Sequence, residues 1–189
     1  ALDKNLREQM QYEIKHIHDR IGITVVYVTH DQSEALTMSN RIAVFNDGLV
    51  QQLSTPDILY EKPENSFVAQ FIGTPKMNIL KVSEADVISS NEVKFLGNNI
   101  KFDEINFSKK NYYFGIRPEH FTVSRDCEYK FKPKIDLTEN LGNEKIAYIK
   151  IDGHDVSAKI PTQNNAIDQI GFSTKDIFVF DENGKRVRS

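Results

Sequence analysis

Near the start of the chain, hydrophobic residues recur every three or four positions between polar ones. The stripe consists of Leu2, Leu6, Met10, Ile14, Ile17 and Ile21. This spacing places all of them on one face of an α-helix. Asp3 stands where an N-cap belongs and Gly22 where a helix ends, so the pattern predicts a helix that stops before Gly22.

The hydrophobic pattern then changes from periodic to continuous. Residues 23–28 read Ile-Thr-Val-Val-Tyr-Val, which is almost entirely β-branched and apolar. Such a run is typical of a strand buried on both faces of a parallel sheet. A helix followed by such a strand predicts one step of an α/β domain, in which ligands bind beyond the carboxyl ends of the strands.

The residues that leave this predicted strand are the main candidates for chemistry. Thr29, His30 and Asp31 follow the strand directly, and residues 31–34 resemble a capping box that opens a short helix through Met38. His30 is either a hydrogen-bonded structural histidine or a donor to a phosphate oxygen. A nucleophilic triad of Ser33, His30 and Asp31 is disfavoured, because residues on one turn rarely reach the mutual geometry required.

Turn signals organise the next part of the chain. Residues 41–53 predict a β-hairpin with a glycine-bearing turn, residues 55–57 a helix start with proline at its first position, and residues 65–72 a second short helix. The change of pattern at residues 73–75 predicts a domain boundary, with one domain in residues 1–73 and another in residues 74–189.

Short strands with turns between them dominate the second domain. The predicted strands cover residues 79–82, 93–96, 100–102, 112–116, 134–137, 145–151, 156–160 and 177–180. Asn98-Asn99 and Asp152-Gly153 are the expected hairpin turns. This series predicts a small all-β barrel or sandwich, of the type that binds oligonucleotides or oligosaccharides.

Composition and charge restrict the function classes. The chain has 189 residues, 39% hydrophobic and 27% charged, which is ordinary for a globular protein. Residues 1–73 contain six Lys or Arg against ten Asp or Glu, and residues 74–189 contain 18 against 17. Neither part has the basic excess of a nucleic-acid-binding domain, so no nucleic-acid partner is expected.

The sequence offers few ways to hold a metal or a nucleotide. Cys127 is the single cysteine, and it is expected to be buried or incidental. His16 and His18 are two residues apart on the predicted helix and point in different directions, so no metal site is expected. The glycine-rich phosphate loop G-x-x-x-x-G-K-[ST] does not occur in this sequence.

Residues 29–35, Thr-His-Asp-Gln-Ser-Glu-Ala, resemble the switch-histidine segment of ATP-binding-cassette (ABC) transporter ATPases. Segments similar to the end of the D-loop, the last core strand and the following helix occur in order at residues 1–3, 40–44 and 55–60. Segments similar to the C-terminal extension of maltose, multiple-sugar and glycerol-phosphate importers occur at residues 67–69, 71–75, 77–78, 115–120, 139–142, 180–181 and 184. Ser54 and Gln70 depart from this subfamily, which usually has glycine at both positions.

This resemblance implies an α/β remnant of an ABC nucleotide-binding domain, followed by an all-β, OB-like regulatory domain of the TOBE type. The phosphate loop and the catalytic carboxylates of the family precede the D-loop and would lie upstream of Ala1, so the chain alone is expected to be inactive. In the full-length ATPase, which uses ATP and Mg²⁺, His30 would contact the γ-phosphate and the attacking water, and Asp3 would lie at the dimer interface.

The resemblance also implies partners and a location. We expect a homodimer, transmembrane permease subunits, a regulatory protein or small ligand on residues 74–189, and a cytoplasmic position on the inner face of the cell membrane. The fragment itself is expected to bind no cofactor. The alternative is a free-standing regulatory or small-ligand-binding β-barrel module, and a nucleic-acid-binding barrel is the third possibility.

Overall fold

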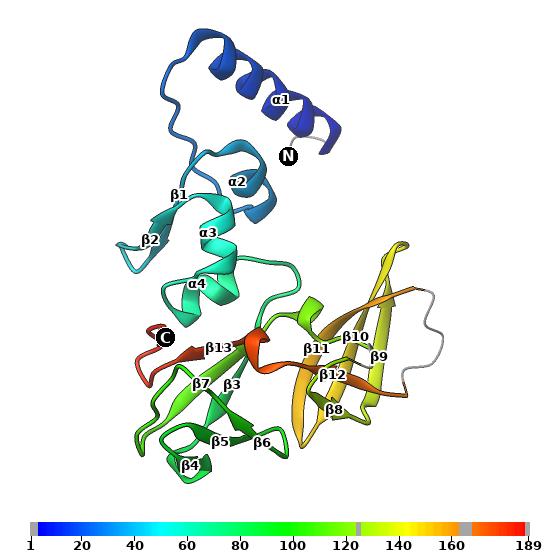
Figure 1. The fold of residues 1–189 in the computed structure, drawn as a ribbon. Helices are drawn as coiled ribbons and strands as arrows, with labels where there is room; N and C mark the ends of the chain where they lie inside the picture. Colours follow the sequence, from blue (N-terminus) through cyan, green and yellow to red (C-terminus); the bar gives the residue numbers. More distant parts are fainter. Residues whose placement is uncertain (1–3, 124–125, 163–167, 188–189) are drawn as a thin grey trace. The chain divides into compact units, whose positions relative to one another are not determined.

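The computed structural model describes residues 4–123, 126–162 and 168–187 (Figure 1). The chain forms two compact units, Ala1–Lys62 and Pro63–Ser189. Each unit has its own helices and strands. No helix in the described ranges is both long enough and apolar enough to cross a membrane.

Three helices and one antiparallel strand pair make up the first unit. They are α1 (Lys4–Ile21), α2 (Gln32–Met38), β1 (Ile42–Asn46), β2 (Leu49–Ser54) and α3 (Pro56–Glu61). The predicted end of α1 is confirmed: Gly22 adopts φ +73°, and its N–H donates to the carbonyl of His18 at 2.8 Å. This is a glycine C-cap.

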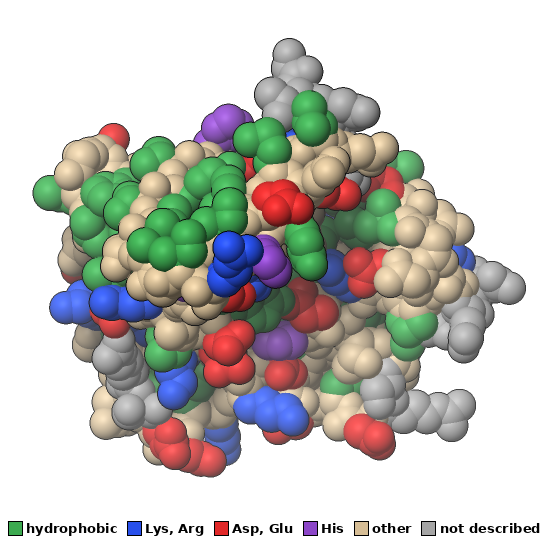
Figure 2. All heavy atoms as spheres, turned by 90° about the horizontal axis from the view of Figure 1, so that it is seen from above, with side chains coloured by type: hydrophobic (Ala, Val, Ile, Leu, Met, Phe, Trp, Pro, Cys, Tyr) green, Lys and Arg blue, Asp and Glu red, His purple; other side chains and the backbone are tan. Residues whose placement is uncertain are grey.

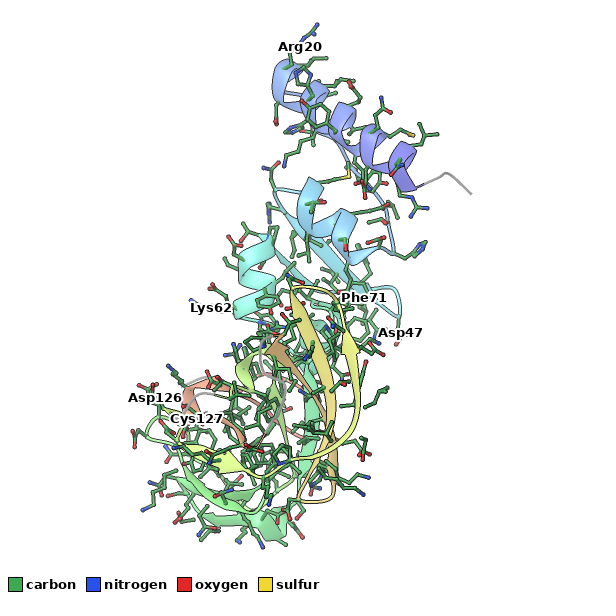
Figure 3. The ribbon with its side chains drawn as sticks, turned by 90° about the vertical axis from the view of Figure 1, so that its right-hand side faces the viewer. Arg20, Asp47, Lys62, Phe71, Asp126 and Cys127 are labelled. Carbon is green, nitrogen blue, oxygen red and sulfur yellow. The ribbon has the colours of Figure 1, made fainter. Side chains whose placement is uncertain are left out.

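The hairpin predicted at residues 41–53 is confirmed as β1 and β2. Asp47 and Gly48 form its turn with φ values of 49° and 77°, and Asp47 is labelled in Figure 3. Two successive positive φ angles match the right-handed twist of the strands, which is why a short polar residue and a glycine occupy these positions.

The predicted strand at residues 23–28 is wrong. The segment forms no strand. Its exposure alternates as in an extended chain, with Val26 and Val28 at 87% and 91% and Val25 and Tyr27 at 43% and 42%. A strand of this composition needs hydrogen-bonded neighbours on both edges, and no described strand pairs with it. All described strand pairs are antiparallel, so the first unit contains no parallel sheet in the part that the structure describes.

The second unit begins with the helix α4 (Ser66–Phe71) and is otherwise built from strands. These are β3 (Asn78–Val82), β4 (Val87–Ser89), β5 (Glu92–Phe95), β6 (Asn98–Lys101), β7 (Tyr112–Ile116), β8 (Tyr129–Phe131), β9 (Lys134–Asn140), β10 (Glu144–Ile151), β11 (His154–Pro161), β12 (Ile170–Phe172) and β13 (Ile177–Phe180). Three short 3₁₀ turns, η1 (Glu84–Asp86), η2 (Pro118–His120) and η3 (Thr174–Asp176), lie between them.

These strands form small antiparallel sheets (Figure 1), and most of their buried side chains gather in a core rich in phenylalanine. The strand orders are β13-β7-β3, β4-β5-β6, β11-β10-β9 and β12-β8. Phe114 lies at the centre, with Phe95 and Phe102 edge-on to it at centroid distances of 5.0 and 5.5 Å. Edge-to-face rings fill such a core without stacking face to face.

The eight strands predicted in the second domain all exist, with ends shifted by a few residues. The turn between β5 and β6, however, is formed by Leu96 and Gly97, with φ 48° and 77°, and not by Asn98-Asn99, which begin β6. Glycine tolerates a positive φ better than asparagine does, so it takes that position. The predicted turn at Asp152-Gly153 is confirmed.

The division between the units falls earlier than the predicted domain boundary. The helix α4 packs on β3 and β7, and Ala69 shares a core cluster with Met77, Phe178 and Phe180. A helix with its apolar face against a sheet belongs to the core of that sheet. The predicted boundary at residues 73–74 therefore lies inside the second unit.

Candidate functional site

The candidate site is the turn that carries His30, between the extended segment and α2. His30 is exposed and lies at a bend in the backbone. The helix begins as predicted, because Asp31 is its N-cap and its Oδ1 accepts from the N–H groups of Ser33 at 2.8 Å and Glu34 at 3.3 Å. These bonds satisfy two of the helix's first amides.

Glu34 does not complete the predicted capping box. Its carboxylate turns away from the cap and accepts from the hydroxyl of Thr29 at 2.5 Å and from the hydroxyl of Tyr27 at 3.2 Å. The side chain is buried, with 8% of the residue exposed. Arg7 of α1 approaches the second carboxylate oxygen to 3.8 Å. Glu34 therefore joins α2 to the extended segment.

The sequence reading missed this role of Glu34, although one signal pointed to it. In an extended segment alternate side chains share a face, so residues 27 and 29 point the same way. Both carry hydroxyl groups. A carboxylate at the start of the next helix is the acceptor that such a pair can reach.

Tyr27 reports the electrostatic environment of this cluster. Burial of its hydroxyl, followed by the negative charge of Glu34, raises the pKa of Tyr27 above its usual value of 10.0. Both effects disfavour the deprotonated, negatively charged form of the tyrosine. The tyrosine therefore stays protonated at neutral pH and keeps donating its hydrogen bond.

A cleft of about 590 Å³ lies beside the extended segment in the first unit. Apolar side chains such as Ile14, Val25 and Met38 line it together with His18 and Arg41. His30 is not among the lining residues. The cleft and the exposed imidazole are thus separate features of this unit.

The other residues singled out in the sequence do not assemble into a site. Asp3 lies outside the described residues. His16 stacks on Tyr12 at 6.2 Å, whereas His18 contacts Asp19 at 3.0 Å, so the two histidines have different partners. The Oδ1 of Asp31, the third residue of the disfavoured triad, accepts from the amides of Ser33 and Glu34 at the start of α2.

Metal-ligating side chains do not gather in one place within the described residues. Mg²⁺ takes oxygen ligands in near-octahedral geometry. The described ranges contain no group of three or more His, Cys, Asp or Glu that could hold a metal ion. The chemistry available at the turn is therefore that of the imidazole itself, which can donate or accept a hydrogen bond.

Two polar residues of the second unit have structural roles. Arg117 is 1% exposed and donates to the carbonyl of Ile72 at 2.9 Å, and its guanidinium lies over the ring of Phe178 at 5.7 Å. Burial, and then the charge of Arg186, lower the pKa of Arg117 to about 10. This value is still above neutral pH, so the guanidinium stays charged there.

Asn78 at the start of β3 links two sheets. Its Nδ2 donates to the carbonyls of Ile116 in β7 and Ser157 in β11, at 3.0 and 2.9 Å. Its Oδ1 accepts from the N–H and the hydroxyl of Ser157 at 2.8 and 3.2 Å. One amide thus satisfies groups on both sides of the interface between the sheets.

Comparison with known proteins identifies a class. The chain is 35% identical to the trehalose/maltose import ATP-binding protein of Thermococcus litoralis, over 96% of the chain and 53% of that protein. It is 44% identical to the oligosaccharides import ATP-binding protein of Bacillus subtilis, over 84% of the chain and 46% of that protein. It is 41% identical to the sn-glycerol-3-phosphate import ATP-binding protein of Salmonella typhimurium, over 78% and 42%.

These relatives are ATP-binding subunits of importers, the class that residues 29–35 indicated. No family model matches the chain. The chain spans about half the length of the curated relatives it matches. It belongs to the family of ATP-binding subunits of ABC importers for sugars and glycerol 3-phosphate.

Proposed function

We propose that this chain is part of the ATP-hydrolysing subunit of an ABC importer for sugars or related solutes. Residues 1–73 would complete an α/β nucleotide-binding domain, and residues 74–189 would form an OB-like, TOBE-type regulatory domain. The relatives are import ATP-binding proteins for sugars and glycerol 3-phosphate, which supports the first assignment. Small antiparallel sheets around one aromatic core support the second.

The exposed imidazole of His30 carries the proposal for the site. His30 is exposed, while hydrogen bonds hold the hydroxyl of Thr29 before it and the amide of Asp31 after it. An imidazole held in this way can donate to a γ-phosphate oxygen and orient the attacking water. Such positioning and charge stabilisation are what phosphoryl transfer requires from the protein.

Replacing His30 in the full-length subunit tests this role. His30→Ala is expected to abolish most ATP hydrolysis and to leave ATP binding nearly unchanged, because a positioning group acts chiefly in the transition state. His16→Ala, on the exposed face of α1, is the matched control. Equal losses of binding and turnover in His30→Ala would instead assign His30 a structural role.

The 189-residue chain alone is expected not to hydrolyse ATP. Its sequence contains no glycine-rich phosphate loop that could cradle the nucleotide. In the full-length protein ATP and Mg²⁺ would bind between two copies, with Asp3 at their interface. Measurable turnover by the purified chain, with contaminating ATPases excluded, would contradict this expectation.

The partners follow from the same proposal. The full-length subunit would form a homodimer and attach to transmembrane permease subunits on the cytoplasmic face of the membrane. Dimerisation of this chain would run through residues 74–189 and be independent of ATP. Sedimentation with and without Mg-ATP measures this, and an equilibrium shifted by the nucleotide would show that the assignment is wrong.

A second candidate function is binding of a small ligand by the second unit. A cleft of about 480 Å³ there is lined by Asn78, Asp136, Tyr148 and Ser157, among others. A tyrosine ring beside the carboxylate of Asp136 suits a polar ligand such as a sugar. Calorimetric titration with sugars, using Tyr148→Ala as the comparison, distinguishes specific binding from none.

A further inference from the structure

Three hydrogen bonds join Thr29, Asp31 and Glu34 in a closed ring around His30, whose imidazole takes no part in them. Thr29 Oγ1 donates to Glu34 Oε2 at 2.5 Å, and the N–H of Asp31 donates to Thr29 Oγ1 at 3.0 Å. The N–H of Glu34 in turn donates to Asp31 Oδ1 at 3.3 Å, which closes the ring through α2. In sequence, His30 lies between Thr29 and Asp31, two of the three residues that form this ring.

Because Glu34 is buried, its carboxylate needs hydrogen-bond donors from neighbouring residues. The residue is 8% exposed, whereas His30 is exposed. A buried carboxylate without donors is costly, and hydrogen bonds to a charged acceptor are among the stronger ones. The half-exposed Arg7 at 3.8 Å contributes little by comparison. The hydroxyls of Thr29 and Tyr27 are therefore the main partners of Glu34.

Capping of α2 does not account for the position of Glu34. Asp31 alone accepts from the amides of Ser33 and Glu34. In a full capping box Glu34 would accept from the N–H of Asp31, but that N–H donates to Thr29. The carboxylate instead holds the residue that precedes His30.

We propose that Glu34 is a positioning residue for His30, which it fixes by holding Thr29 and, through Thr29, the amide of Asp31. The effect of Glu34 on ATP hydrolysis rests on the proposed function of His30. The ring itself does not depend on that function. The two ideas can therefore be tested apart.

The kinetic experiment uses the full-length subunit and separates kcat from KM for ATP. Glu34→Ala is expected to lower kcat by about 10-fold to 100-fold, the scale of a small misplacement of a reacting group, with KM changed less than about twofold. The variant Glu34→Gln should keep most of the activity, because the amide oxygen of glutamine can still accept from Thr29. Glu13→Gln, an exposed glutamate of α1, is the control and should leave kcat unchanged.

Substitution of Thr29 covers the case in which Glu34→Ala fails to fold. Thr29→Val removes the hydroxyl but keeps the shape, and it should reproduce the loss of kcat. Thr29→Ser should restore it. If Thr29→Val keeps full kcat while His30→Ala loses it, the proposed positioning path is wrong.

A readout without ATP tests the ring in the 189-residue chain. Amide hydrogen exchange at Asp31 should be at least about tenfold faster in Glu34→Ala and Thr29→Val than in the unchanged chain, because the amide loses its ordered acceptor. Unchanged exchange would overturn the proposal. Faster exchange together with a fully active His30→Ala subunit would instead keep the ring and reject the role proposed for His30.

Discussion

Asn78 shows how much of the second unit depends on one side chain. Asn78→Ala removes both N–H donors of Nδ2 and the oxygen Oδ1, which accepts two hydrogen bonds. The groups of Ser157 and Ile116 that bonded to them stay partly buried and lose these partners. We expect a loss of about 1–3 kcal/mol in the free energy of unfolding of this unit. Urea denaturation measures the loss. Asn106→Ala, at an exposed position, is the control and should change stability by less than about 0.5 kcal/mol.

Two glycines in strands are expected to differ in their tolerance of alanine. A Cβ at Gly171 in β12 would lie 2.2 Å from the backbone oxygen of Tyr129, which cannot move without breaking the β8–β12 pair. A Cβ at Gly115 in β7 would meet side chains, the sulfur of Met77 nearest at 2.5 Å, and Met can change its rotamer.

Gly171→Ala should therefore destabilise the unit by about 1–3 kcal/mol, as overpacking does, and Gly115→Ala by less. Thermal melts of the two variants in parallel measure the order. If Gly115→Ala were the more damaging change, the backbone of β8 would not be what excludes a side chain at residue 171.

Single side chains were predicted only where a local rule governs them. Asp31 was identified because an N-cap is set by its own neighbours in sequence. The contacts of Glu34 and Asn78 join segments that no local pattern relates, and the bonds of Asn78 to Ser157 span 79 positions. Such contacts arise from packing, which the sequence encodes only collectively.

At the scale of elements, η3 has an acid-sensitive anchor. Glu128 accepts from the N–H and the hydroxyl of Thr174 at 2.9 and 2.7 Å, and these bonds lower the pKa of Glu128 below its usual value of 4.5. A depressed pKa stabilises the folded state above pH 4.5, and that contribution is lost as the pH falls through the folded-state pKa.

Glu128→Gln is thus expected to lower the Tm near neutral pH, and the difference from the unchanged protein should shrink below pH 4.5. Circular-dichroism melts at a series of pH values measure this. Glu182→Gln, an exposed glutamate, is the control. A difference that grows in acid would show that the Thr174 bonds do not favour the ionised form.

The predictability of elements followed their length and their neighbours. The longer strands were found because alternation and turn residues mark them, whereas β4, β8 and β12, at three residues each, are too short to show a period. Residues 23–28 have the strongest strand pattern of the first unit but no described pairing partner. Strand propensity expresses a fit to neighbouring strands, so composition alone does not create the strand.

At the scale of the molecule, the second unit should reach its full stability only when residues 63–73 are part of it. Residues 63–73 bury Val68, Ala69 and Ile72 completely. They also supply the carbonyls of Ile72 and Glu64, which accept from Arg117 and from the N–H of Arg186. Removing them exposes core surface and takes away the Ile72 carbonyl, which accepts from the buried guanidinium of Arg117.

A truncated chain of residues 63–189 is expected to unfold cooperatively, and one of residues 74–189 to fold with lower stability, by about 3 kcal/mol or more, from the loss of Val68 and Ile72 alone. Calorimetry of both chains measures the difference. Equal transition temperatures would show that α4 adds nothing to this core, and that the predicted boundary at residues 73–74 describes the folding unit better.

Many large apolar side chains of this protein are exposed to solvent. On the face shown in Figure 2 they lie in groups beside charged side chains. Residues 23–28 are the most consequential, because they are extended, uncharged, free of proline and exposed. A segment of this kind is a template for cross-β assembly, in which copies stack through their backbones and interlock their valines.

The concentrated chain is therefore expected to aggregate through this segment, with a lag that shortens as concentration rises. Val26→Lys places a charge at its centre and should suppress the process, whereas Val50→Lys, on the exposed part of β2, should not. Thioflavin fluorescence and light scattering follow it. Six residues that would be harmless inside a sheet are thus expected to limit the concentration at which this chain can be handled.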